Sequence, residues 1–167
     1  LVALPESSLL SIRFGREKGG LAPTVTFPCL SGVSELAVAD WDTDGQPDLF
    51  VLSRDEKQVA LTRRLDNGRV PFPKLLPIEG RPLAMAVGQL SPKSKPVLAL
   101  ILDREGKRFL QVRSHDGTAH TQALDEKYKA NPSILQFHDV DQDGLNDIVA
   151  MAAFEKIKIL RHVLGED

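Results

Sequence analysis

This chain of 167 residues has little cysteine, few aromatic residues and no large excess of charge of either sign. The single cysteine, Cys29, has no second thiol with which to form an intrachain disulfide, so cysteine usage does not indicate a compartment. A formal net charge of −2 creates no field that would attract a polyanion, and we therefore expect no nucleic-acid partner. Apolar runs long enough to cross a bilayer are missing too, so we expect no membrane span.

Catalytic signatures are equally scarce. The sequence has no Gly-x-Ser-x-Gly elbow, no glycine-rich phosphate loop, no His-Glu-x-x-His motif and no haem-attachment motif. A catalytic pair of acids for glycoside hydrolysis remains an open alternative, because glutamates distant in sequence can meet in space. Nothing in the sequence singles out a particular pair. The glutamates concerned are Glu35, Glu79, Glu105, Glu126 and Glu155. These observations favour a protein that is not an enzyme.

What the chain does contain is a nine-residue acidic loop that occurs twice, at residues 40–48 and 139–147. Each copy has aspartates at positions 1, 3, 5 and 9 and a glycine at position 6. Alternate side chains of a tight loop can converge on one point, and Ca²⁺ takes about six to eight oxygen ligands. The expected ligands are the carboxylates of Asp40, Asp42, Asp44, Asp48, Asp139, Asp141, Asp143 and Asp147, with backbone carbonyls from Gln46 and Leu145.

The loops differ from an EF-hand. That motif ends in a bidentate glutamate at position 12 between two helices, and here position 12 is Val51 in one copy and Ala150 in the other. Short apolar runs rich in β-forming residues flank both copies, which places each loop in a β-hairpin. Because the loop's own oxygens nearly fill the coordination shell, we expect two structural Ca²⁺ ions, each fixing a hairpin.

A third, degraded copy lies midway between the two acidic loops. Residues 83–90 and 96–102 resemble the flanking strands, but residues 91–95 replace the acids with serine, proline and lysine. Aligning Gly88 with Asp40 and Asp139 gives spacings of 48 and 51 residues. Repeats of this length are typical of a four-stranded propeller blade.

The remaining pattern extends the repeat over the whole chain. An Asn-Gly turn at residues 67–68 predicts a hairpin between strands at 58–64 and 69–72. The chain is expected to be all-β, with about three four-stranded blades in one propeller segment that is incomplete as a closed ring. The approximate repeats are 30–77, 78–128 and 129–167, with 1–29 as the outer strands of a preceding blade. Since closed propellers usually have about four to eight blades, the chain is expected to be a fragment, to be closed by another chain, or to form an unusually small assembly.

The chain resembles the FG-GAP/VCBS repeat family, which includes the head domain of integrin α subunits. The resemblance lies in the motif Asp-x-Asp-x-Asp-Gly-x-x-Asp, which stands between two apolar strands in units of about fifty residues. The middle loop departs from that pattern, and the Phe-Gly and Gly-Ala-Pro signatures are not present in order. The resemblance implies a calcium-stabilised β-propeller that acts as a non-catalytic scaffold for a protein or carbohydrate ligand. It also implies an extracytoplasmic location, where calcium is plentiful enough to fill loops of modest affinity.

Other interpretations remain at this point. Some propellers with such repeats resemble polysaccharide lyases, and the chain is alternatively part of such an enzyme or a docking subunit of a larger complex. Trp41 is expected to lie against the neighbouring blade rather than to stack on a sugar. His138 precedes the second loop, but hard cations prefer oxygen, so packing or hydrogen bonding is the expected role.

Overall fold

The structure is a computed structural model that describes residues 2–4 and 7–161. The regular elements along these residues are fourteen β-strands, arranged in four small antiparallel sheets, none of which closes on itself. The prediction of an all-β chain is confirmed. Each sheet is a meander made from one continuous stretch of chain, as expected where consecutive strands are joined by short turns.

Two sheets have three strands and two have four. The first sheet contains β1 (Val2–Leu4), β2 (Leu9–Ile12) and β3 (Val25–Pro28), and the second contains β4 (Val33–Ala39), β5 (Asp48–Ser53), β6 (Gln58–Arg63) and β7 (Lys74–Leu75). The third contains β8 (Arg81–Gln89), β9 (Pro96–Arg104), β10 (Lys107–Ser114) and β11 (Ala119–Ala123). The fourth contains β12 (Ile134–His138), β13 (Asp147–Met151) and β14 (Lys158–Leu160).

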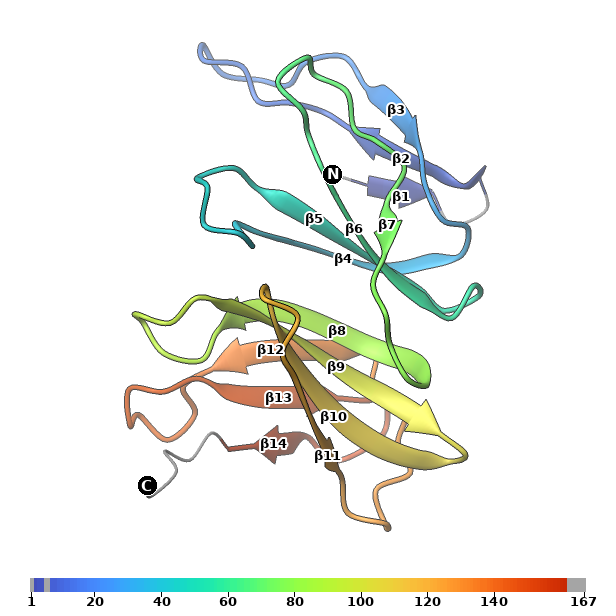
Figure 1. Cartoon of the computed structure of the whole chain (residues 1–167), viewed down its shortest axis with the longest axis vertical. Helices are drawn as coiled ribbons and strands as arrows, with labels where there is room; N and C mark the ends of the chain where they lie inside the picture. The colour runs from blue at the N-terminus through green and yellow to red at the C-terminus, as the bar shows by residue number, and fades with distance from the viewer. Residues whose placement is uncertain (1, 5–6, 162–167) are drawn as a thin grey trace.

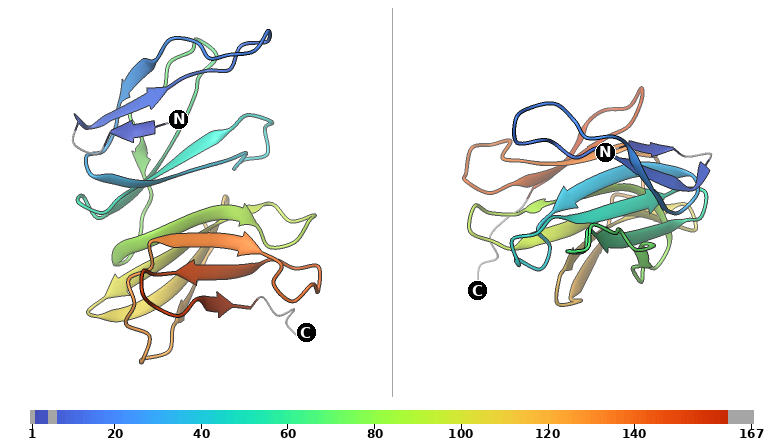
Figure 2. Two further views of the ribbon diagram at one scale, coloured as in Figure 1. Left: turned by 180° about the vertical axis from the view of Figure 1, so that it is seen from behind. Right: turned by 90° about the horizontal axis from the view of Figure 1, so that it is seen from above.

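The four sheets follow one another through the molecule in chain order, each packed on the next (Figures 1 and 2). The first strands of the second, third and fourth sheets, β4, β8 and β12, lie next to one another at the inside of the arrangement. Together they line a groove of about 640 Å³. This arrangement is blade-like.

The hydrophobic core consists of three layers, one between each pair of consecutive sheets. The first layer includes Leu10 and Val51, the second includes Phe50 and Leu100, and the third includes Ile101. Strands such as β5 are buried on both faces, which explains their nearly continuous apolar sequences. A fully buried side chain such as Phe50 contributes about 1.5–3 kcal/mol through the hydrophobic effect.

In the second and third sheets, alternate residues of the second strand face opposite neighbouring sheets. In β5, Leu49 and Val51 pack towards the first sheet, and Phe50 packs towards the third. In β9, Leu98 packs back towards the second sheet and Ala99 packs forward towards the fourth. The side-chain period of two therefore gives each central strand one face for the preceding sheet and one for the following sheet.

Strand register corrects the expected alignment of the repeats by one residue. The pairs Ala39↔Asp48, Gly88↔Val97 and His138↔Asp147 each close an eight-residue connection: residues 40–47, 89–96 and 139–146. Gly88 is thus equivalent to Ala39 and His138, at spacings of 49 and 50 residues, and not to Asp40. A side chain at Gly88 has no room, since a Cβ there would lie 2.6 Å from Cδ2 of Phe137.

The last strand of the second sheet also differs from expectation. The turn at Asn67-Gly68 forms as predicted: Gly68 has φ of 80° and donates its N–H to the carbonyl of Leu65 at 2.8 Å. Residues 69–72, all of which the structure describes, do not form the expected strand. The strand that pairs with the outer edge of β6 is β7. Prolines at 71 and 73 explain the difference, because they have no N–H to donate to a sheet.

Two candidate metal centres

Both acidic loops connect the first and second strands of a sheet, β4 to β5 and β12 to β13. With the middle loop (residues 89–96), they lie on one side of the molecule (Figures 1 and 2). In each acidic loop the first three aspartates converge, with one oxygen from each lying within 4.8 Å of the others. The converging sets are Asp40, Asp42 and Asp44, and Asp139, Asp141 and Asp143.

The two acidic loops have the same backbone conformation. Positions 4 and 6 have positive φ in both: 62° at Thr43 and 85° at Gly45, and 64° at Gln142 and 88° at Gly144. In each loop the glycine donates its N–H to Oδ2 of the first aspartate, at 3.0 Å. The N–H of position 7 is likewise donated to Oδ1 of the third aspartate, at 2.8 Å. The repeated sequence thus folds into a repeated structure.

The last aspartate of each loop is placed differently from the other three. Asp48 and Asp147 are 1% and 2% exposed, and neither belongs to the converging set. Asp48 accepts the N–H of Trp41 at 3.0 Å, and Asp147 accepts that of Val140 at 3.3 Å. These bonds fasten the start of each loop to the strand that follows it. Coordination by Asp48, by Asp147 and by the carbonyls at position 7 stays a prediction.

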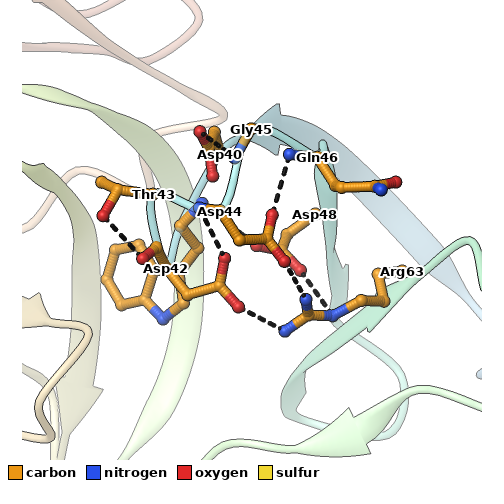
Figure 3. A network of polar contacts seen from close by, with 9 residues as sticks. Asp40, Asp42, Thr43, Asp44, Gly45, Gln46, Asp48 and Arg63 are labelled. Carbon is orange, nitrogen blue, oxygen red and sulfur yellow. Dashed lines mark hydrogen bonds and ion pairs between the residues drawn. The ribbon is translucent and has the colours of Figure 1, made fainter.

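An arginine from the neighbouring strand reaches into the first acidic loop (Figure 3). Arg63, at the end of β6, contacts three carboxylates: Asp42 at 2.6 Å, Asp44 at 2.8 Å and Asp48 at 3.3 Å. The hydrogen bond from Arg63 lowers the pKa of Asp42, whereas burial raises the pKa of Asp48. Arg63 was not among the residues expected from the sequence, because only the register of β5 and β6 brings it beside Asp48.

The second acidic loop has a weaker version of the same contact. Ile148 pairs with Leu160 at the end of β14, so the next residue, Arg161, occupies the position equivalent to Arg63. Its guanidinium lies 3.6 Å from the carboxylate of Asp141. In the third sheet, whose loop lacks the acids, the equivalent position is Ser114, paired with Val97. The arginine therefore accompanies the acidic loops and is missing where the acids are missing.

Asp40 carries the clearest sign of an unfilled bonding requirement. Its Oδ2 accepts the N–H of Gly45, but its Oδ1 is buried and has no hydrogen-bond partner among the described residues. Burying a polar atom without a partner is costly, and a carboxylate oxygen is costlier still. A cation among Asp40, Asp42 and Asp44 would satisfy this atom. Donors that are all oxygen suit a hard cation such as Ca²⁺.

The middle loop cannot take up the backbone of the acidic loops. Position 4 is Pro92, whose ring fixes φ at a negative value, and residues 89–96, all of which are described, contain no positive φ. This loop instead receives Asn146 from the second acidic loop, which donates its side chain to the carbonyl of Gln89 and its N–H to that of Leu90, both at 2.8 Å. Asn146 thereby joins two neighbouring loops.

Of the two other residues singled out from the sequence, Trp41 is placed as expected, and the packing or hydrogen-bonding role of His138 stays a prediction. Trp41 is 4% exposed and makes edge-on contacts with Phe50 and with His115 of the third sheet, with ring centroids 5.2 and 6.1 Å apart. It packs against the neighbouring sheet, which confirms the prediction. His138 lies outside the converging carboxylates.

Comparisons with protein-family models, curated proteins and solved structures give no match to this chain. Over the residues that the structure describes, no helix has the length and apolar character needed to cross a membrane.

Proposed function

We propose that the chain is a calcium-stabilised segment of a β-propeller of the FG-GAP/VCBS type and serves as a non-catalytic scaffold for a protein or carbohydrate ligand outside the cytoplasm. The observation that carries the proposal is the pair of acidic loops with one backbone conformation, each bringing three carboxylates within 4.8 Å. Three ionised carboxylates at this distance repel one another, and a bound cation removes that repulsion.

A structural role for the ion follows from where the loops lie. Each one joins the two strands that start its sheet, and its last aspartate is buried beside the following strand. An ion held by Asp40, Asp42 and Asp44, or by their counterparts in the second loop, would fix the hairpin. Its positive charge would balance the negative charge of the carboxylates. The chemistry needed here is electrostatic, and it involves no reacting group.

The groove lined by β4, β8 and β12 supports a binding role over a catalytic one. Among its lining residues, all within the described part of the chain, His138 is the one titratable side chain. A lyase would need several acidic, basic or tyrosine groups that converge on the substrate. Aliphatic side chains and the amides of Gln89, Gln136 and Asn146 make up much of the rest of the lining, which suits recognition by contact and hydrogen bonding.

Thermal unfolding with calcium and with a chelator tests the proposal. At calcium concentrations about ten to a hundred times Kd, each filled site adds about 1.4–2.7 kcal/mol to the free energy of unfolding. For a chain of this size that raises the melting temperature by roughly 3–10 °C per site. A melting temperature that is the same in calcium and in chelator would overturn the structural-calcium role.

Matched variants make the test specific to the loops. Asp42→Asn and Asp141→Asn each remove one charge while keeping a side-chain oxygen of similar shape. Each single variant is expected to lose part of the calcium-induced shift, and the double variant is expected to lose most of it. A shift that persists in the double variant would place the ion elsewhere. Magnesium provides a further arm, because its demand for a small octahedral shell predicts a weaker effect than calcium.

A further inference from the structure

Arg63 places its positive charge beside two of the three converging carboxylates of the first acidic loop. Its three nitrogens approach three different carboxylates, and its Nη2 and Nη1 atoms lie 2.6 and 2.8 Å from Asp42 and Asp44. Those two aspartates also belong to the converging set. Carboxylate oxygens engaged by a guanidinium fork at these distances are not free to turn towards an ion. The arginine and the cation therefore require the same acids.

The second acidic loop supplies the comparison. Its backbone has positive φ at the same positions as the first loop, but Arg161 lies 3.6 Å from Asp141, and its side chain is 66% exposed compared with 39% for Arg63. Asp139 and Asp143 have no arginine contact among the described residues. An exposed pair at this distance contributes little. The two loops thus differ in how much of the carboxylate set is already neutralised.

We propose that Arg63 is a built-in competitor of the cation in the first acidic loop, so that this loop binds calcium more weakly than the second. This inference rests on the proposed calcium role and adds to it a difference between the two sites. In the ion-free chain the guanidinium neutralises Asp42 and Asp44. For the ion to bind, these contacts must open, and the apparent Kd rises by the inverse of the fraction of molecules in which they are open.

Space for the displaced side chain lies next to the loop. A cavity of about 290 Å³ is lined in part by Arg63, Pro47 and Val38. Val38 is 56% exposed, which shows that this side of β4 is open. The guanidinium can leave Asp42 and Asp44 while Asp48, its register partner, stays beside it. Release therefore needs no movement of β6.

A supporting role for Arg63 predicts the opposite result. If the arginine held the aspartates in the geometry that the ion requires, its loss would weaken binding at the first loop. If it competes, its loss strengthens binding there and lowers the stability of the ion-free chain. The sign of the change in affinity separates the two roles.

The experiment measures ion binding to the full chain, one loop at a time. Trp41 is the one tryptophan and lies at position 2 of the first loop, so light absorbed by tryptophan sensitises the emission of Tb³⁺, an oxygen-binding surrogate for calcium, at that loop. Displacement of Tb³⁺ by calcium then gives the calcium affinity of the first loop. Calorimetry on Asp44→Ala, which disables the first loop, gives the calcium affinity of the second.

Arg63→Gln is expected to lower the calcium Kd of the first loop by roughly tenfold, the factor for a site that is open about one-tenth of the time. Arg161→Gln is the matched control and should leave the affinity of the first loop unchanged. In the unaltered chain, the second loop should bind calcium more tightly than the first. An unchanged or higher Kd in Arg63→Gln would overturn the inference while leaving the calcium role intact.

Two further outcomes separate the inference from the proposed function. Binding at the first loop that appears only in Arg63→Gln would support the competition in its strongest form. If calcium binds to neither loop, both in the original chain and in Arg63→Gln, the inference and the calcium role are both overturned. Arg63→Lys guards against a folding defect, because a lysine keeps the charge but cannot bridge several carboxylates. Its Kd at the first loop should lie between those of the original chain and Arg63→Gln, and a value equal to that of the original chain would contradict the competition.

Discussion

The two acidic loops have the same acid spacing and backbone conformation but different surroundings. Both loops place positive φ at positions 4 and 6 and bury the last aspartate. The first has an arginine whose nitrogens lie 2.6 and 2.8 Å from two of the converging carboxylates, whereas the arginine of the second lies 3.6 Å from Asp141. The difference shows that the loop's own sequence determines where carboxylates converge, while a residue on the next strand determines how strongly they are neutralised without an ion.

Removing the buried aspartate should give the largest effect, of similar size in both loops. In chelator, Asp147→Ala leaves the N–H of Val140 without its acceptor, and Asp48→Ala leaves that of Trp41 without its acceptor and removes a partner of Arg63. Each variant is expected to cost about 2–4 kcal/mol of unfolding free energy. Urea-induced unfolding measures both values.

The asparagine variants are the controls for this comparison. Asn retains an oxygen that can accept the same N–H, so Asp48→Asn and Asp147→Asn should each cost less than the corresponding alanine variant. At position 48 the neutral side chain also avoids the cost of an ionised carboxyl whose pKa burial has raised. Equal losses for alanine and asparagine at either position would show that the hydrogen bond to the loop is not what stabilises the hairpin.

Substituting the loop glycines should give a smaller effect that is equal in both loops. Gly45 and Gly144 have φ of 85° and 88°, and a Cβ at either position would meet nothing within 4 Å. The cost of Gly45→Ala and of Gly144→Ala is therefore backbone strain alone, about 1–2 kcal/mol. Urea unfolding in chelator should return similar values for the two variants. A difference much above 1 kcal/mol would mean that the loops do not share one backbone conformation in solution.

Sequence reasoning was most successful where chemistry depends on neighbours along the chain. The all-β class and the hairpin positions of the acidic loops follow from local spacing, and the structure bears them out. Of the four aspartates expected to converge in each loop, the structure brings the first three together. The strand at 69–72 failed for a local reason that was visible, the prolines at 71 and 73. The one-residue error at Gly88 arose because β8 and β9 continue for one more pair than the strands around the acidic loops.

Contacts between strands and between sheets were harder to predict. Arg63 lies 15 residues after Asp48 in the sequence, and the two meet only once the register of β5 and β6 is known. Asn146 meets Gln89 and Leu90 across two sheets, so this contact depends on how those sheets pack. Both contacts depend on tertiary geometry that no spacing rule encodes, although the repeat allows Arg161 to be inferred once Arg63 is seen.

The smallest expected effect is a dependence on pH that differs between the loops. The hydrogen bond from Arg63 lowers the pKa of Asp42 in the folded chain below its ordinary value of about 4. A carboxyl whose pKa is lower in the folded chain than in the unfolded chain stabilises the fold at pH values above its unfolded pKa. That stabilisation is lost as the pH falls through the folded pKa.

In chelator, Asp42→Asn should therefore melt at a slightly lower temperature than the original chain at neutral pH, and the difference should disappear as the pH falls below about 4. Asp141→Asn should show a smaller gap at neutral pH, because Arg161 stands farther from its carboxylate. Melting curves between about pH 7 and pH 3 measure both gaps. A gap for Asp42→Asn that persists at the acidic end would show that its cost comes from lost shape or hydrogen bonding, and would remove the charge difference on which the contrast between the loops depends.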